Sequence, residues 1–238
     1  GGRELTIELN NWADQTNGSA LARYGDTVVL ATAVMSKDPR EGNNFFPLLV
    51  DYQERFYAAG KIKGSRFVKR EGRPSDEATI TGRVIDRSIR PRFDLRMRND
   101  VQIVATVLSF DKKNDADIPA LLASSCALAI SDIPWRGPIG IVKVGRVNGD
   151  YILNPSMQDA ETSDFLITLS GTKDKINMIE VGAKEVGEED LLAAFEFGAK
   201  YIKKIVEFQE EIVKENGSAK KQVPLFEIDA SLKHEVEE

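Results

Sequence analysis

The chain has 238 residues, of which 42% are apolar and 29% charged, and its net charge at neutral pH is −6. These proportions are typical of a soluble globular protein of one or two domains. A single histidine, His234, and a single cysteine, Cys126, exclude a histidine-based triad, a multi-histidine metal site and a disulfide from within the chain. No apolar run is long enough to cross a membrane, and we expect a cytoplasmic protein.

The first part of the chain favours β-structure. Apolar residues alternate with polar ones over residues 5–9, and residues 20–24 and 27–34 flank the turn pair Gly25-Asp26. We therefore predict a hairpin around this turn, and a further strand over residues 46–52. Residues 60–74 predict a loop, because they combine glycine, proline and many basic residues with little apolar periodicity. Ordered loops of this length are uncommon and tend to be functional.

Helices and strands alternate in blocks after this loop. Ser75 is a suitable N-cap for a helix over residues 76–90, which Pro91 ends. The pattern then predicts a strand over residues 101–110 and a second helix over residues 117–131. A hairpin around Asn148-Gly149 joins strands over residues 139–147 and 151–153. Two more strands follow over residues 165–169 and 176–181, and a long helix over residues 188–215.

Hairpin-connected strands with helices between them indicate an α+β fold rather than a strictly alternating βαβ fold. We assign residues 1–215 to one core domain. The remaining residues, 216–238, are charged and too short to fold alone, so we expect a linker or the start of another domain.

The negative net charge hides a segregation of charge along the chain. Residues 54–98 contain thirteen basic and six acidic residues and carry a charge of +7, which leaves −13 for the rest. Ten of these bases are arginine, the residue that binds phosphate through two parallel hydrogen bonds. A localised polyanion site has this appearance, and so does a charged face that pairs with the acidic remainder.

Three arginines form a stripe on the predicted helix 76–90. Arg83, Arg87 and Arg90 are spaced i, i+4 and i+7, beside an apolar face, and Asp86 falls off the stripe on a helical wheel. Like charges at this spacing repel each other, so the stripe favours a phosphate ligand. The alternative is that these arginines pair with acids of another element or subunit.

The basic loop places an aromatic ring, Phe67, among cations. Single-stranded nucleic acid binds to this mixture, since bases stack on the ring and the backbone contacts the cations. Phe67 could also simply anchor the loop to the core.

These segments together resemble the polynucleotide phosphorylase family, in its first RNase PH-like core domain. The resemblance is carried by residues 56–65, 67–75 and 83–91, and residues 3–8, 24–32 and 137–140 fit the same family in order. It spans most of the chain, from residue 1 to about residue 215.

The resemblance implies an RNase PH-like fold and an enzyme that degrades RNA from its 3′ end by phosphorolysis. It implies a homotrimer around a channel for single-stranded RNA, possible contacts with other RNA-decay proteins, and use of Mg²⁺ and inorganic phosphate. Phe67, Val68, Lys69 and Arg70 would form a constriction loop, in which Val68 replaces a second aromatic residue and Lys69 an arginine. Arg83 and Arg87, with Arg90 on the same stripe, would hold RNA phosphates.

The resemblance also implies that this core has lost catalysis. A Ser-Ser pair that binds phosphate in the catalytic second core aligns with Ala116-Asp117, and two Asp and a Lys align with Ala160, Leu166 and Thr168. We therefore expect the ligands of Mg²⁺ and phosphate outside this chain, and no catalytic residue or metal ligand within it.

Two other functions stay open at this stage. Asp115, Asp117 and Asp164 could hold a metal in a hydrolytic nuclease, although their spacing matches no two-metal template, and Asp115 and Asp117 are better explained as caps of the helix that follows. The chain could also be a structural, ring-forming module whose arginines pair with acids at a subunit interface.

Overall fold

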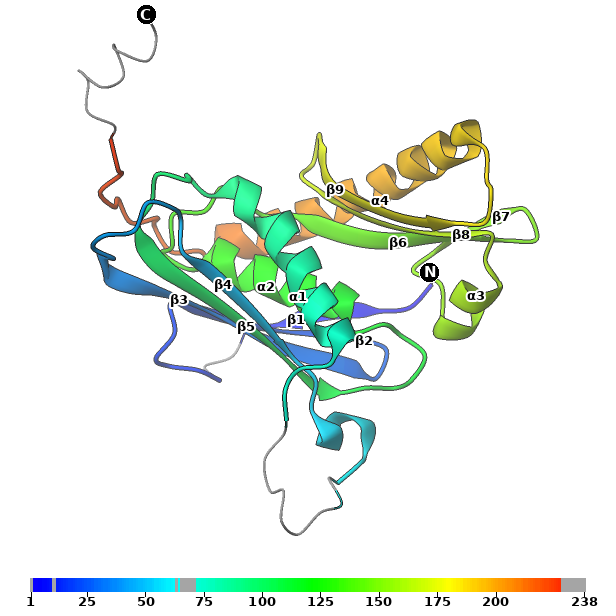
Figure 1. Cartoon of the computed structure of the whole chain (residues 1–238), viewed down its shortest axis with the longest axis horizontal. Coiled ribbons are helices and arrows are strands. Elements are labelled where there is room, and N and C mark those ends of the chain that lie inside the picture. Colours follow the sequence, from blue (N-terminus) through cyan, green and yellow to red (C-terminus); the bar gives the residue numbers. More distant parts are fainter. Residues whose placement is uncertain (1, 10–11, 63, 65–71, 228–238) are drawn as a thin grey trace, which may run out of the picture.

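The computed structural model describes residues 2–9, 12–62, 64 and 72–227, and these residues form two β-sheets packed around a central helix (Figure 1). In the first sheet the strands lie in the order β1-β2-β3-β5-β4. Their bounds are Leu5–Glu8 for β1, Gly18–Tyr24 for β2, Thr27–Pro39 for β3, Leu48–Gln53 for β4 and Asn99–Ser109 for β5. The second sheet lies further along the chain, and the fold is α+β as predicted.

The hairpin predicted around Gly25-Asp26 is confirmed, with Tyr24 paired to Thr27 across the turn. Gly25 has a φ of +63°, a conformation that glycine adopts without strain. At the other edge of the sheet, β4 is parallel to β5. A parallel pair needs a crossover connection, and α1 (Asp76–Ile89) supplies it, so one βαβ unit lies within a mainly antiparallel sheet.

The second sheet is antiparallel throughout and has the order β7-β6-β8-β9. Its strands are β6 (Gly140–Val147), β7 (Asp150–Leu153), β8 (Phe165–Gly171) and β9 (Ile176–Ala183). Between β7 and β8 the structure adds a short helix, α3 (Met157–Thr162), which the apolar pattern does not indicate. Ser156 and Asp159 form a capping box at its start, which is the sequence signal for this helix.

Helix α2 (Asp117–Ile130) joins the two sheets. It packs on β2, β3 and β5 of the first sheet and on β6 of the second, and residues 117–129 are all buried. A helix that is apolar on every side is stable only in such a position. Cys126 lies on this helix and is fully buried, so its side chain packs in the core.

Helix α4 (Glu188–Asn216) covers the second sheet and approaches it closely at Gly198. A Cβ atom on Gly198 would lie 2.6 Å from Leu169 Cδ1 and 3.1 Å from Val144 Cγ2. Two 3₁₀ turns, Phe56–Ala59 and Arg90–Arg92, complete the regular structure of the described residues. No helix of the described part of the chain combines the length and the apolar composition that crossing a bilayer requires.

The residues after α4 return to the core, although the sequence marks them as a linker. Lys220 Nζ donates hydrogen bonds of 2.7–2.9 Å to the carbonyl groups of Leu128, Ala129 and Ser131 at the end of α2. Leu225 then forms a bridge with Met97. The described part of the tail, up to residue 227, therefore packs against the core through a few contacts while most of its side chains stay exposed, and partial burial lowers the pKa of Lys220 to about 8.

The close approach at Gly198 generates a prediction about stability. Gly198→Val should lower the free energy of unfolding by about 1–3 kcal/mol, since the added methyl groups overpack the interface between α4 and the sheet. Urea denaturation measures this loss. Lys200→Val, at an exposed position of the same helix, controls for the helix propensity of valine. Equal stability of the two variants would contradict the packing described here.

Candidate nucleic-acid interface

Helix α1 begins and ends as the sequence predicts. Ser75 caps it by accepting a hydrogen bond of 2.9 Å from the backbone N–H of Ala78, and Asp76 and Glu77 lie in its positive first turn. Its apolar face is buried against the first sheet, and consists of Ala78, Gly82, Ile85 and Ile89. This packing fixes which side of the helix faces outward.

Arg83 and Arg87 lie on the exposed side of α1. Neither guanidinium makes an ion pair or a hydrogen bond with any residue that the structure describes. The two side chains border a shallow hollow of about 480 Å³, which is also lined by Asp86, Arg90 and Pro91. The stripe thus presents two guanidinium groups that can bind an anion.

Arg90 differs from the other two arginines because its guanidinium has partners within the chain, and its contact with phosphate stays a prediction. Its Nε and Nη2 atoms donate to the carboxylate of Asp86 at 2.6 and 2.7 Å. Its Nη1 and Nη2 atoms also donate to the carbonyl groups of Phe46 and Leu48, at 3.2 Å each. Asp86 lies off the stripe on a wheel but at i,i+4 from Arg90, within reach of its long side chain. Arg90 therefore fastens the end of α1 to β4.

A polar network attaches α1 to the second sheet. Ser170 Oγ bonds to Ser88 Oγ at 2.8 Å and to Asn177 Oδ1 at 2.9 Å, and Asn177 Nδ2 donates to the carbonyl group of Ser88. Ser88 and Ser170 are fully buried. Satisfied buried hydrogen bonds of this kind specify one orientation of the packed elements. They hold α1, and with it the arginine stripe, in a fixed position on the core.

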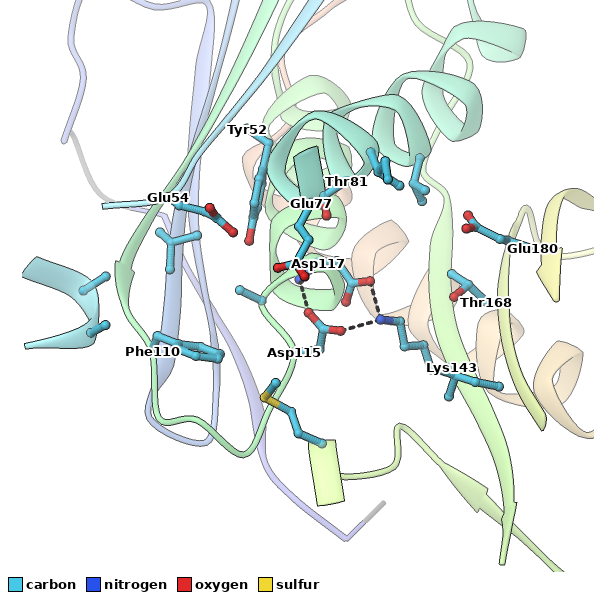
Figure 2. A pocket seen from close by; sticks show the side chains of 18 of the residues that line it. Tyr52, Glu54, Glu77, Thr81, Phe110, Asp115, Asp117, Lys143, Thr168 and Glu180 are labelled. Carbon is cyan, nitrogen blue, oxygen red and sulfur yellow. Dashed lines mark hydrogen bonds and ion pairs between the residues drawn. The ribbon is translucent and has the colours of Figure 1, made fainter. Parts of the chain in front are cut away.

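A larger cavity, of about 740 Å³, lies on another side of α1 and reaches both sheets (Figure 2). Asp115 and Asp117 enter it at the start of α2, and Lys143 enters it from β6. Lys143 Nζ lies 2.5 Å from Asp115 Oδ2 and 2.6 Å from Asp117 Oδ2. One ammonium group thus bridges two carboxylates across the two halves of the molecule.

Burial governs the protonation of these groups. It raises the pKa of Asp117 to about 6, with a further increase from the charge of Asp115, while Lys143 acts in the opposite direction. For Lys143, burial lowers the pKa, but the two carboxylates more than offset this and raise it. Burial and the nearby carboxylates also raise the pKa of Tyr52, whose ring forms part of the cavity wall.

Two family models match consecutive parts of the chain. Domain 1 of the 3′ exoribonuclease family matches residues 1–134, and domain 2 of the same family matches residues 137–201. The chain belongs to the 3′ exoribonuclease family. The junction between the two matches falls after α2, so the first model covers the first sheet and the second model covers the second sheet.

Polyribonucleotide nucleotidyltransferases are similar to this chain over nearly all of its 238 residues. The protein from Heliobacterium modesticaldum is 54% identical over 237 residues, which are 100% of this chain and 33% of that protein. The protein from Enterococcus faecalis is 53% identical over 99% of this chain and 33% of its own length. The chain thus spans about a third of these relatives, and the similarity is to their first RNase PH-like core.

Solved structures confirm the RNase PH-like fold. A chain of the Archaeoglobus fulgidus exosome with RNA bound to the active site superposes with a TM-score of 0.70 at 19% identity, covering 87% of this chain and 88% of that one. Rice Rrp46 superposes with a TM-score of 0.72 at 18% identity, covering 89% and 95%. At these identities the likeness concerns the fold.

The positions that the family resemblance marks as substituted are gathered in the structure. Asp117, Leu166 and Thr168 all line the 740 Å³ cavity, together with Ala116. Ala160, on α3, is outside the described lining of that cavity. Four of the five aligned positions thus share one site, although they come from the start of α2 and from β8.

The acids proposed for a hydrolytic nuclease do not gather in the same way. Asp164 pairs with Arg146 at 3.0 Å, whereas Asp115 and Asp117 share Lys143. The described residues contain no group of three or more side chains that could hold a metal ion. Asp115 Oδ1 accepts a hydrogen bond of 3.4 Å from the backbone N–H of Asp117, at the start of α2, whereas Ala116 is the N-cap residue and has no side-chain bond. A Mg²⁺ ion does not fit here, because an ammonium group already occupies the position between the two carboxylates.

Phe67, Val68, Lys69 and Arg70, the residues of the expected constriction loop, lie outside the described residues. Arg73 and Pro74, which follow them, are exposed at the start of α1. The role of this loop therefore stays a prediction.

Several residues of the cavity are missed by the sequence analysis, above all Lys143. It is the one charge among the apolar residues 139–145, which is the signal that could have singled it out. Its partners are 26 and 28 residues away, so only the packing of β6 on α2 reveals the pair. Glu77, Tyr52 and Glu180 reach the cavity from three further elements.

The buried bridge generates a prediction about pH. Lys143→Met should lower the free energy of unfolding by about 3 kcal/mol at pH 8, because two carboxylates then face each other without a cation. The loss should shrink toward pH 5. Folded Asp117 takes up a proton at a higher pH than the unfolded residue, with its ordinary pKa of 3.8, so stability rises as the pH falls through this range.

Urea denaturation at pH 8 and pH 5 measures both effects. Lys203→Met, an exposed position on α4, is the matched control and should change stability little at either pH. A loss of stability in Lys143→Met that is the same at both pH values would contradict the assignment of a buried carboxylate pair.

Proposed function

We propose that the chain is the RNA-binding first core of a phosphate-dependent 3′→5′ exoribonuclease, a polyribonucleotide nucleotidyltransferase that acts in RNA and mRNA degradation. The observation that carries the proposal is the pair of exposed guanidinium groups on α1 of a family member, Arg83 and Arg87, which have no partner among the described residues. Phosphate groups of single-stranded RNA are the ligands that such a pair fits.

The way α1 is held supports this role. Arg90, Asp86, Ser88 and Ser170 are all engaged in contacts within the core, so the helix is rigid where the two exposed arginines project from it. A rigid support reduces the entropy lost on binding. Phe67, Val68, Lys69 and Arg70 would add a stacking ring and cations upstream of this helix.

Catalysis belongs, in this proposal, to the complete protein, and this chain alone is inactive. Mg²⁺ and inorganic phosphate would be bound by residues outside the chain. Two features support this: the ammonium of Lys143 lies between the carboxylates of Asp115 and Asp117, and Asp117 stands at a position that the family resemblance aligns with a phosphate-binding serine. Like charges repel, so Asp117 disfavours phosphate at that position.

The remaining parts of the proposal concern assembly. We propose a homotrimer that encloses an RNA channel, contacts with other RNA-decay proteins, and a place in the cytoplasm. The relatives are polyribonucleotide nucleotidyltransferases, and a similar fold occurs in an exosome with bound RNA, which supports an oligomeric RNA-degrading enzyme.

RNA binding is tested by removing the two exposed arginines. Arg83→Ala/Arg87→Ala should weaken binding of a single-stranded oligoribonucleotide roughly 100-fold, since each of the two charge-assisted contacts contributes about 1.5 kcal/mol. The slope of log K against log salt concentration should fall in magnitude by about 1.4, which corresponds to two phosphate contacts on a single strand. Fluorescence anisotropy at several salt concentrations measures both quantities.

The control removes the same charge elsewhere. Arg23→Ala/Lys203→Ala takes two exposed cations from β2 and α4, and should leave the affinity within about twofold. If the stripe variant binds RNA as tightly as the unmodified chain, the arginines serve a structural, ring-forming role instead.

Catalytic inactivity of the chain is tested separately. The purified 238-residue chain, supplied with Mg²⁺, inorganic phosphate and a labelled oligoribonucleotide, should release no nucleoside diphosphate. Thin-layer chromatography of the products distinguishes the outcomes. Release of nucleoside diphosphates would show that the chain is catalytic, and release of monophosphates without phosphate would indicate the hydrolytic alternative.

A further inference from the structure

The 740 Å³ cavity beside α1 has a negative lining that the proposed function does not use. Its charged residues are five acids and two bases, so its net charge is −3 when all are ionised; they are Glu54, Glu77, Asp115, Asp117, Glu180, Arg55 and Lys143. Its volume lies within the range of about 300–1,000 Å³ that is typical of small-molecule sites. A ligand attracted to this lining must be cationic.

Two carboxylates at the rim of the cavity have no counter-charge among the residues that the structure describes. Inside, Lys143 pairs with both Asp115 and Asp117 and offsets one of their two negative charges, and Glu54 accepts a hydrogen bond from Ser75 Oγ. Glu77 on α1 and Glu180 on β9 make neither an ion pair nor a side-chain hydrogen bond with any described residue. Two elements from different halves of the molecule thus bring carboxylates to one cavity (Figure 2).

Two polar groups without a hydrogen-bond partner among the described residues lie deeper in the cavity, and one of them is a fully buried atom. Tyr52 is 7% exposed, and its hydroxyl group points into the cavity beside Asp117 and Glu54 (Figure 2). This hydroxyl makes no hydrogen bond with a residue of the described ranges. Asp117 is 9% exposed, and its Oδ1 atom likewise has no hydrogen-bond partner there. Buried polar atoms usually have partners, so a ligand that supplies N–H donors would complete this site.

The spacing of the acids decides between two kinds of cation. A metal ion needs several ligands that converge on one point, and the described residues contain no such group. Here the carboxylates are instead spread around a cavity whose other walls are apolar, including Val84, Phe110 and Leu166. Such a lining fits an elongated ligand with separated cationic groups and an apolar chain between them.

We propose that this cavity binds a linear aliphatic diamine or polyamine of the spermidine type. One ammonium group would lie between Glu77 and Glu180 at the rim, another would donate to Tyr52 Oη and to Asp117 inside, and the methylene chain would contact the apolar wall. Lys143 already shows this chemistry, since it brings an ammonium group on an aliphatic chain to Asp115 and Asp117. Neither Arg83 nor Arg87 lines the cavity, so this site does not depend on RNA binding.

Isothermal titration calorimetry of the 238-residue chain with spermidine, at low salt and without RNA, tests the proposal. We expect saturable binding of one molecule per chain. Tyr52→Phe removes the hydroxyl acceptor and should weaken binding about tenfold. Glu77→Gln/Glu180→Gln removes the rim charges while keeping their size, and should also weaken binding about tenfold, because each exposed pair contributes modestly.

Glu211→Gln, an exposed acid on α4 outside the cavity, is the matched control and should bind spermidine like the unmodified chain. Thermal unfolding establishes that Tyr52→Phe is folded, and the rim variant changes exposed residues only. The proposal is overturned if no saturable binding occurs, or if the control loses as much affinity as the rim variant. It is also overturned if butylamine, which has one ammonium group, or Mg²⁺ displaces spermidine at equal concentration.

Discussion

The burial of α2 is the constraint on which the rest of the structure depends. This helix is apolar on every side and needs cover from both sheets at once, so the two halves of the chain cannot be packed independently. Its burial also brings a charged residue, Asp117, into the interior at its first turn. Because a buried carboxylate is costly without a counter-charge, Lys143 of the second sheet has to meet it there. The packing of a hydrophobic helix thus dictates the position of the ion pair, and the ion pair in turn shapes the cavity.

The sequence predicts well what local chemistry decides. The turn at Gly25-Asp26, the cap at Ser75 and the exposed face of α1 all depend on neighbours within a few residues, and the structure has them as expected. The pairing of Asp86 with Arg90 was also within reach, since i,i+4 spacing is a local signal. The wheel missed it because a wheel records the direction in which a side chain leaves the helix and ignores its length.

What the sequence could not predict depends on contacts between distant segments. Asp115 and Asp117 looked like helix caps because caps are a local explanation, and Lys143 becomes their partner only when β6 packs against α2. Ser88 and Ser170 are 82 residues apart. Their hydrogen bond fixes the orientation of α1 on the second sheet, which the apolar periodicity of the helix does not reveal. The family resemblance identified Asp117, Leu166 and Thr168 as substituted positions, and the tertiary structure shows that these positions share a cavity with chemistry of its own.

Both ends of α2 are held by lysines from elsewhere in the chain. Lys143 reaches its first turn from β6, and Lys220 donates to its last carbonyl groups from beyond α4. Neither end is satisfied until the second sheet and the tail are in place, so a partly folded chain would leave the helix with an unpaired charge at one end and bare carbonyl groups at the other. We therefore expect the two sheets to unfold as one cooperative unit, in which the amide protons of α2 would exchange with solvent only when the whole core opens. The tail after α4 takes part in that cooperativity, at the opposite end of the helix from the cavity.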